Sequence, residues 1–273
     1  MYVLGIRENE QVTAWRPEVP GVAEVFHARF TEHAYPAHTH DAWTLLIVDD
    51  GAVRFDLDRH PRGAAAELVT LLPPHVPHDG RAATPHGFRK RVLYLDTPLL
   101  GERLIGPAVD APGWADPVLR HRIDQLHRVL AQPGEELHAA SRLAFVAERL
   151  RQHLRPGTGV PRPDRKHANH LADRLRQLLD ANVTGGVTLD RAAELLHAHP
   201  THLVRAFTRA HGLPPHRYLT GRRVDLARRL LLAGQPPAEV AAAAGFYDQA
   251  HLSRHFGRML GTTPARYARG AHR

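Results

Sequence analysis

The sequence predicts an α+β protein of two domains, in which a small β-sandwich or barrel with a pair of helices precedes an all-α domain. Three observations predict this order. Short strand-like segments separated by turn residues fill the first hundred residues, and helical spacing of apolar residues replaces them after Trp114. Residues 155–167 contain three prolines and two glycines, which is typical of a linker, and the chain beyond them is helical in pattern. We therefore expect domains at 1–154 and 168–273.

Alternating or continuous apolar residues predict the strands of the first domain. Every second side chain from Val22 to Phe30 falls on one face of the first predicted strand. Asp49-Asp50-Gly51 predicts a tight turn between the second and third strands, because glycine tolerates positive φ. The five predicted strands are residues 22–30, 43–48, 53–57, 68–72 and 91–95.

Two amphipathic helices are predicted after Trp114, over residues 116–131 and 135–154. Apolar residues recur every three or four positions in both segments, and Pro133-Gly134 separates them. Their apolar stripes have two interpretations, which are packing against the β-structure and formation of a dimer interface. One apolar face can serve both purposes.

Positive charge is concentrated in the second domain. Residues 168–273 contain 15 Lys and Arg against 7 Asp and Glu, whereas residues 1–154 contain 17 against 20. This asymmetry favours a polyanionic partner for the second domain alone. A solvated surface that keeps the protein soluble is the alternative that charge by itself leaves open.

Two segments of the second domain share one plan, in which a short helix, a turn of about four residues and a longer helix follow one another. They are residues 189–211 and 237–260, and a long helix predicted over residues 218–232 joins them. A helix-turn-helix inserts its second helix into the DNA major groove, which is wide enough to admit it. The joining helix is about 20 Å long at 1.5 Å per residue, so two reading helices can enter major grooves about one DNA turn apart.

The outward faces of the two reading helices carry side chains suited to bases and phosphates. Gln suits adenine, Arg suits guanine or phosphate, and an apolar contact suits the thymine methyl group. The predicted DNA-binding residues are Thr201, His202, Arg205, Thr208 and Arg209 in the first helix, and Gln249, Ala250, Ser253, Arg254 and Arg258 in the second.

Two stretches of the second domain resemble the AraC/XylS family of transcription regulators. One is AAAAGF…DQAHLSRHFGRMLGTTPARY, within residues 240–267, and the other is LDRAAELL…PTHLVRAFTRAHGLPPHRYL…RRVDLARRLL, which precedes it. The resemblance implies a seven-helix domain that binds double-stranded promoter DNA. His199 stands where the family usually has a stronger N-cap residue before the first reading helix, so we expect the second reading helix to dominate binding.

The first domain also resembles a known module. The segments PAHTHD at residues 36–41 and LLPPHVPHDG at residues 71–80 are similar to the cupin-type sensor of AraC-type regulators. The resemblance implies a cupin-like β-barrel that senses a small-molecule effector, followed by a helical pair that forms a homodimer. The chain is then a sequence-specific regulator that responds to an effector and, if it is an activator, contacts RNA polymerase.

The histidines of these segments have two interpretations. His38 and His40 are two residues apart and share a strand face, and His78 follows a later strand. Three histidines can bind zinc or iron, but Thr44 or Leu45 stands where metal-binding cupins have a glutamate. Because 22 histidines make such groupings frequent by chance, a pocket-lining or structural role is favoured over metal ligation, and no cofactor is expected. The candidate effector-binding residues are His38, His40, Trp43, His78, Arg89 and Tyr94.

Several function classes are excluded or disfavoured. The absence of cysteine excludes disulfides, thiol catalysis and cysteine-ligated zinc. No apolar run approaches the roughly 20 residues of a membrane span and no signal peptide is evident, so we expect a cytoplasmic protein with no membrane partner. We expect no enzymatic activity, because both the glycine-rich phosphate loop and the Gly-x-Ser-x-Gly elbow are missing. Two alternatives stay open: a cupin metalloenzyme fused to a DNA-binding module, and a DNA-binding dimer that needs no effector.

Overall fold

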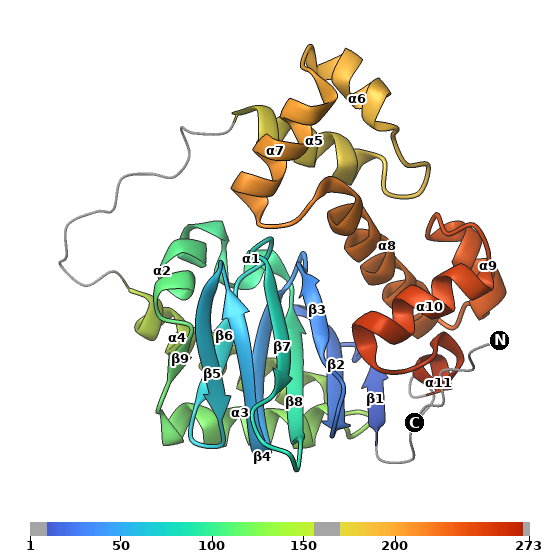
Figure 1. Cartoon of the computed structure of the whole chain (residues 1–273). Helices are drawn as coiled ribbons and strands as arrows, with labels where there is room; N and C mark the ends of the chain where they lie inside the picture. Colours follow the sequence, from blue (N-terminus) through green and yellow to red (C-terminus); the bar gives the residue numbers. More distant parts are fainter. Residues whose placement is uncertain (1–9, 156–169, 270–273) are drawn as a thin grey trace.

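The computed structural model describes residues 10–155 and 170–269 (Figure 1). Of the predicted linker, residues 155–167, all but Arg155 lie outside the described residues. The first described part is a β-domain with helices packed on one side, and the second is helical throughout (Figure 1). The predicted α+β architecture is confirmed.

Antiparallel pairing connects nine strands within the described part of the chain. One sheet has the order β1-β2-β8-β4-β6-β9, and β4 continues into a second sheet with β5, β7 and β3. The five predicted segments all lie in strands, two of them within the single strand β4, and β1, β3, β5, β7 and β9 are additional. The strands are β1 (Gln11–Trp15), β2 (Val22–Phe30), β3 (Tyr35–His38), β4 (Trp43–Leu57), β5 (His60–Ala65), β6 (Val69–Leu72), β7 (His78–Ala82), β8 (Phe88–Leu95) and β9 (Gly113–Trp114).

The turn predicted at Asp49-Asp50-Gly51 is wrong, because β4 runs through it as one strand. The register against β8 shifts between Val48 and Asp50, which is a bulge, and Gly51 has φ of +71°. A Cβ atom on Gly51 would lie 2.1 Å from the carbonyl oxygen of Gly87, so only glycine fits. β4 therefore bends from one sheet into the other at this point instead of reversing.

Alternation along the strands divides the apolar side chains between two faces. Phe26 and Leu46 point into the space between the sheets, whereas Trp43 and Leu45 point to the opposite face. A bulge in β2 between Val22 and Glu24 moves Val22 to that opposite face, which corrects the prediction that it shares a face with Phe30.

Helices cover the outer face of the larger sheet. Leu143, Val146 and Leu150 of α4 are buried against it, so the apolar stripe packs on the β-domain as one of the two interpretations had it. Two large apolar residues of α4 face away from this core, since Leu137 is 83% exposed and Phe145 is 62% exposed. The helices of this part are α1 (Thr97–Leu100), η1 (Glu102–Leu104), α2 (Ile105–Asp110), α3 (Pro117–Leu130) and α4 (Glu136–Leu154).

The described residues of the second domain form seven helices, as the family resemblance implies. α6 and α7 form the first helix-turn-helix, α9 and α10 form the second, and α8 joins them (Figure 1). The helices are α5 (His170–Ala181), α6 (Leu189–Leu196), α7 (Pro200–His211), α8 (Pro215–Leu232), α9 (Pro237–Ala243), α10 (Gln249–Leu260) and α11 (Pro264–Arg269), of which α11 was not predicted.

The two helix-turn-helix units differ in what they pack against. The first has its own apolar core with α5, built around Leu203 and Phe207. The second, built around Leu252 and Phe256, shares one continuous core with the interior of the β-domain. α8 and α10 both contact β3, so the second unit is docked on the β-domain.

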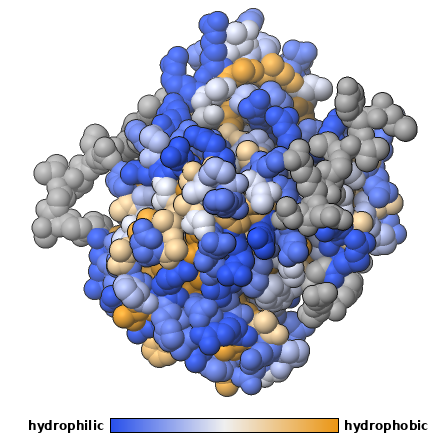
Figure 2. Space-filling view, turned by 60° about the horizontal axis from the view of Figure 1, so that its bottom comes forward, coloured by the Kyte–Doolittle hydropathy of each residue, from blue (hydrophilic) through white to orange (hydrophobic). Residues whose placement is uncertain are grey.

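Few large apolar side chains of the described residues are exposed, as expected when most of them lie in the cores. The face in Figure 2 is mostly hydrophilic, and its apolar residues form small separate patches. None of the helices in the described residues is both long enough and apolar enough to cross a membrane.

Candidate functional site

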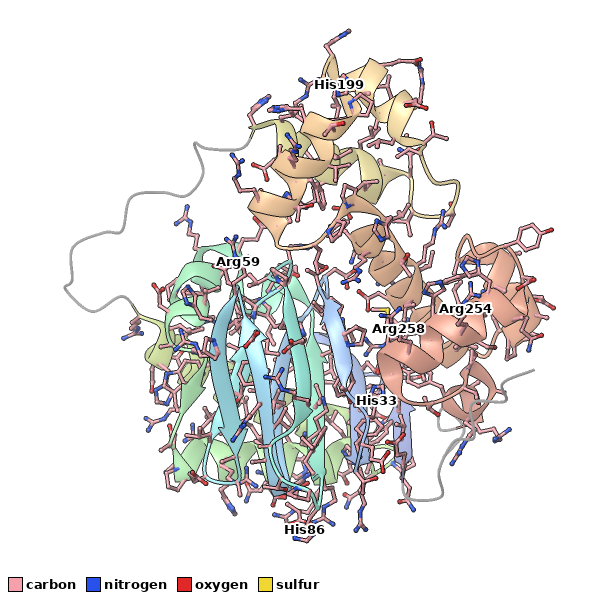
Figure 3. All side chains as sticks on the ribbon, in the orientation of Figure 1. His33, Arg59, His86, His199, Arg254 and Arg258 are labelled. Atoms are coloured by element: carbon pink, nitrogen blue, oxygen red, sulfur yellow. The ribbon has the colours of Figure 1, made fainter. Side chains whose placement is uncertain are left out.

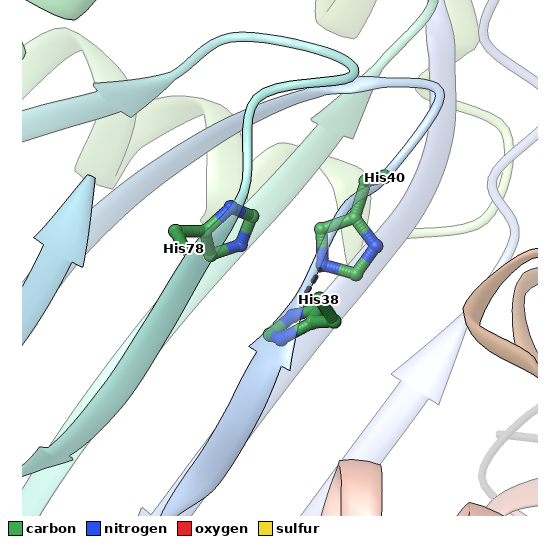
Figure 4. Close-up of side chains that lie close together, drawn as sticks. All are labelled: His38, His40 and His78. Atoms are coloured by element: carbon green, nitrogen blue, oxygen red, sulfur yellow. Dashed lines mark hydrogen bonds between the residues drawn. The ribbon is translucent and has the colours of Figure 1, made fainter. Parts of the chain in front are cut away.

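Three histidines meet where β3 and β7 pair (Figure 4). His38 ends β3 opposite His78, the first residue of β7, and His40 follows in the loop toward β4. Nε2 of His38 lies 3.1 Å from Nε2 of His40, and the His38 and His78 ring centroids are 4.5 Å apart. The structure therefore brings together the three histidines that the sequence singled out.

All three histidines are buried, with exposed fractions of 6–7%. Burial lowers the pKa of His78 to about 4, and burial together with neighbouring positive charge holds the pKa of His38 and His40 well below 6.5. At neutral pH the three side chains are uncharged imidazoles, which can accept hydrogen bonds or bind a cation.

The cavity around these histidines has walls from both domains. Tyr94, one of the candidate effector residues, lines it, and so do Lys90 of β8 and Asp225 and Arg228 of α8. The free space inside is about 40 Å³, which admits a few water-sized groups. Burial, with the nearby charge of Arg228, lowers the pKa of Lys90 to about 7.

Two predicted effector residues do not reach this cavity. Trp43 is fully buried in the core under α3 and α4, and Arg89 is exposed at a shallow surface groove beside β1. Both lie on the opposite face of the sheet from Tyr94, because successive side chains of a strand alternate. Every second residue of β8 shares a face with Tyr94, so strand alternation predicts Lys90, and not Arg89, in the cavity.

The α8 residues of the cavity belong to a buried polar network that joins the domains. Nη2 of Arg228 lies 2.8 Å from Oε1 of Glu24, and the Arg228 guanidinium lies 4.1 Å from the centroid of the Tyr94 ring. The hydroxyl group of Tyr267 also donates to Glu24. Asp225 accepts a hydrogen bond from Nδ1 of His40 at 3.1 Å. The sequence contains no signal for these contacts, because their partners lie about 200 residues apart.

A second set of ion pairs lies beside the cavity. Asp41 pairs with Arg222 at 3.1 Å and with Arg229 at 3.0 Å. Burial alone raises the pKa of Asp41, but the two arginines outweigh it and bring the pKa to about 2. A groove of about 550 Å³ opens here, lined by Arg16, Glu18, Glu24, Asp41, Arg228 and Arg229 among others.

The predicted DNA-binding residues lie on the outward faces of α7 and α10. Figure 3 places Arg254 and Arg258 along α10, and His199 at the start of α7. Thr208 and Ser253 are half-buried, and the other eight residues of the set are exposed. The hydroxyl group of Thr208 donates to the carbonyl oxygen of Val204, which occupies its single hydrogen within the helix and leaves only its acceptor capacity.

The N-caps of the reading helices differ as predicted. Nδ1 of His199 accepts a hydrogen bond from the Thr201 amide at 3.3 Å, which is long. Oδ1 of Asp248 accepts one from the His251 amide at 2.6 Å, and a carboxylate is also favoured by the helix dipole. The N-terminus of the second reading helix is therefore capped more strongly than that of the first.

Comparison with known proteins agrees with this geometry. A family model described as an AraC-like ligand binding domain matches residues 20–153, and one described as a helix-turn-helix domain matches residues 192–270. The chain belongs to the AraC family of transcription regulators. Both halves of the AraC-type arrangement are thus present, in the order that the sequence predicted.

Relatives of this AraC-type chain include regulators from bacteria. It is 22% identical over 241 residues to the HTH-type transcriptional regulator YobQ of Bacillus subtilis, covering 85% of this chain and 88% of YobQ. It is 26% identical over 255 residues to the transcriptional activator RhaS of Pectobacterium atrosepticum, covering 86% of this chain and 88% of RhaS. The match to YbfI of Bacillus subtilis, 28% identical, spans 48% of this chain and about half the length of that protein, 46%.

Solved structures show the same fold. ToxT of Vibrio cholerae O395 superimposes with a TM-score of 0.56 at 11% identity, covering 97% of this chain and 99% of ToxT. ToxT has also been solved with an unsaturated fatty acid bound, and that structure has a TM-score of 0.58 at 12% identity, covering 96% of each chain. At this identity the likeness establishes the two-domain fold that the AraC-type chain shares with ToxT.

Proposed function

We propose that this AraC-type chain regulates transcription by binding promoter DNA through α7 and α10, and that a small-molecule effector bound between its two domains controls that binding. The observation that carries the proposal is the shared wall of the cavity and groove. His40 and Tyr94 of the sensor and Asp225 and Arg228 of α8 line both spaces. An occupant of either space therefore contacts both domains.

The groove is the better candidate for the effector itself. Its volume of about 550 Å³ falls in the range of small-molecule sites, whereas the cavity admits only a few water-sized groups. Charged residues of both signs line it, which suits a small polar molecule. An effector that competes with the Asp41–Arg229 ion pair changes how α8 docks on the sensor.

A homodimer formed through α4 is part of the proposal. Leu137 and Phe145 are exposed on the helix whose other face is buried in the β-domain. Exposed apolar side chains at positions eight apart lie on one helix face, where a second copy can cover them. In this arrangement the protein acts in the cytoplasm as a dimer and contacts RNA polymerase when it activates transcription.

The test begins with the full chain and DNA from the native cell. Sequencing the fragments that the protein retains identifies its target site, and a metabolite library screened by thermal shift identifies ligands. A ligand of the proposed site should change the affinity of the protein for DNA. The Tyr94→Ala variant should no longer bind this ligand, whereas Arg89→Ala should still bind it, because Arg89 lies on the opposite sheet face. Failure to retain any DNA at low salt contradicts the proposed regulator. Equal ligand loss in both variants contradicts the proposed effector site.

A further inference from the structure

The hydrogen bonds of the three buried histidines determine where their protons lie. Nδ1 of His38 lies 2.7 Å from the carbonyl oxygen of Pro36, and Nδ1 of His78 lies 3.1 Å from that of Val76. Nδ1 of His40 lies 3.1 Å from Oδ1 of Asp225. Carbonyl and carboxylate oxygens only accept, so each Nδ1 carries the hydrogen. A neutral imidazole has one such hydrogen, which leaves a lone pair on all three Nε2 atoms.

The lone pairs of His38 and His40 face each other without a hydrogen between them. One ligand atom from each histidine lies within 4.8 Å of the others, and Nε2 of His38 is 3.1 Å from Nε2 of His40. Two acceptors at this distance repel each other, and burial removes the water that would separate them. A cation bound by all three Nε2 atoms converts this repulsion into attraction.

We propose that His38, His40 and His78 bind a divalent transition-metal ion of the Zn²⁺ type through Nε2. Neutral imidazole is a preferred ligand of zinc, cobalt, nickel and iron and a poor ligand of magnesium and calcium. Ligand nitrogens about 2.0–2.1 Å from one ion lie about 3.0–3.4 Å apart, so the His38–His40 pair already fits and His78 needs a shift on the order of 1 Å. The free space of about 40 Å³ leaves room for the ion and bound water.

The ion is coupled to the DNA-binding domain through Asp225 of α8. A carboxylate that accepts from the outer nitrogen of a metal-bound histidine orients the ring and strengthens the metal–nitrogen bond. Asp225 is 6% exposed, and its Oδ2 atom has no hydrogen-bond partner within the described residues. Arg222 lies 3.8 Å from that atom. Metal binding and docking of α8 therefore stabilise each other, because coupling between two equilibria is reciprocal.

The experiment measures metal binding by the full chain, freed of metal with a chelator. Co²⁺ titration followed by visible absorption reports nitrogen coordination directly, and competition with Zn²⁺ gives its affinity. We expect one ion per chain. His38→Gln and His78→Gln should abolish the signal, and Asp225→Asn should weaken affinity about 10- to 100-fold. Asp41→Asn is the matched control, because Asp41 pairs with Arg222 and Arg229 of the same helix without contacting Nδ1 of His40.

Two outcomes overturn the inference. If the folded wild-type chain, checked by circular dichroism, binds neither Co²⁺ nor Zn²⁺, the site does not exist. Equal metal affinities for Asp225→Asn and Asp41→Asn overturn the coupling through Asp225. Should one histidine variant fail to fold, the other still tests the ligand set.

The expected effect of the bound metal on DNA affinity rests on the proposed function and is measured separately. DNA affinity of the wild-type chain should change when Zn²⁺ is added, and the change should be smaller in Asp225→Asn than in Asp41→Asn. A DNA affinity that is indifferent to Zn²⁺ overturns the coupling. Absence of DNA binding with and without metal contradicts the proposed function instead, and the Co²⁺ spectrum still decides the metal site.

Discussion

Glu24 of β2 and Arg228 of α8, 204 residues apart in the sequence, form a buried ion pair that joins the sensor to the DNA-binding domain. Both side chains are less than 8% exposed, and Arg228 also stacks on Tyr94 of the cavity wall. Removing one member of a buried pair leaves an uncompensated charge, which costs about 3–5 kcal/mol. This pair therefore ties the position of α8 to the space between the domains, where we propose that the effector binds.

Glu24→Gln should loosen the docking of α8 on the sensor. The amide lacks the charge that Arg228 requires, so the polar interaction that holds α8 against β2 is weakened while the apolar core shared by the two domains is retained. Hydrogen–deuterium exchange should increase in α8 and α11, with much less change in α3. The control is Asp41→Asn, which breaks more exposed ion pairs of the same helix and should have the smaller effect. Unchanged exchange in Glu24→Gln would show that apolar packing alone holds the domains together.

Arg205 and Arg254 should read bases in different halves of the DNA site. A bidentate arginine–guanine pair discriminates by about 1–3 kcal/mol, so each alanine variant should weaken specific binding roughly ten- to hundredfold. The stronger cap at Asp248 leads us to expect the larger loss for Arg254→Ala. Titration against single-base variants of the native site measures both effects. A larger loss for Arg205→Ala would reverse the order that the capping geometry predicts.

Arg258→Ala should weaken binding to all sequences alike. Arg258 is exposed one turn beyond Arg254 on α10. Base contacts come from the N-terminal residues of a recognition helix, so we expect Arg258 to contact phosphate. Loss of one phosphate contact should reduce the slope of log affinity against log salt by about one. Binding to native and unrelated DNA over a salt series checks this. Arg89→Ala removes one positive charge from the sensor surface and should leave the slope unchanged.

Leu137→Glu combined with Phe145→Glu should convert the proposed homodimer to a monomer. Both residues are exposed in a single chain, so charges there do not disturb the core that α4 forms with the sheet. In a dimer the same charges would be buried without partners. Light scattering after size-exclusion chromatography measures the mass, and Leu195→Glu on α6 is the control at another exposed leucine. A dimer that survives the double substitution uses a different surface.

His127 should make the sensor domain sensitive to acid. It is 2% exposed on α3, where burial, His27 and Arg91 hold its pKa well below 6.5. Nδ1 of His127 lies 3.2 Å from Nε2 of His27, whose pKa burial and Arg91 lower to about 4. The unfolded chain binds protons near pH 6.5 that the folded chain does not bind, so the free energy of unfolding falls as pH falls below 6.5.

The expected slope is about 1.4 kcal/mol per pH unit for each such histidine. Urea unfolding at pH 7.0 and pH 5.5 should therefore show that the free energy of unfolding decreases less between these two pH values in His127→Leu than in the wild type. His86→Gln, at an exposed histidine of the loop before β8, should behave like the wild type. The same loss in all three proteins would contradict a role for His127.

Sequence periodicity predicted the helices of the second domain except α11, because helices depend on local spacing and local end signals. Pro200 and Pro237 begin helices, Gly212 and Gly261 end them in the left-handed region, and the apolar spacing between them shows which face is buried. The outward faces of α7 and α10 follow directly from that spacing. The family resemblance rested on these same residues.

In the first domain, the sequence determined which histidines meet but not what surrounds them. Short strands carry a weaker signal than helices, and a single bulge changes the face of every residue before it, as Val22 shows. At Gly51 a bulge and a turn have the same sequence signature, and only the close approach of Gly87 decided between them.

Only the tertiary structure placed Asp225 and Arg228 against His40, Tyr94 and Glu24. In the sequence these two residues belong to a joining helix, and their i, i+3 spacing explains no more than an ion pair within that helix. Docking α8 on the sheet buries both charges, and buried charges require partners. The β-domain supplies those partners from residues some 200 positions earlier, so the link between the proposed effector site and the DNA-binding domain arises from packing and not from local sequence.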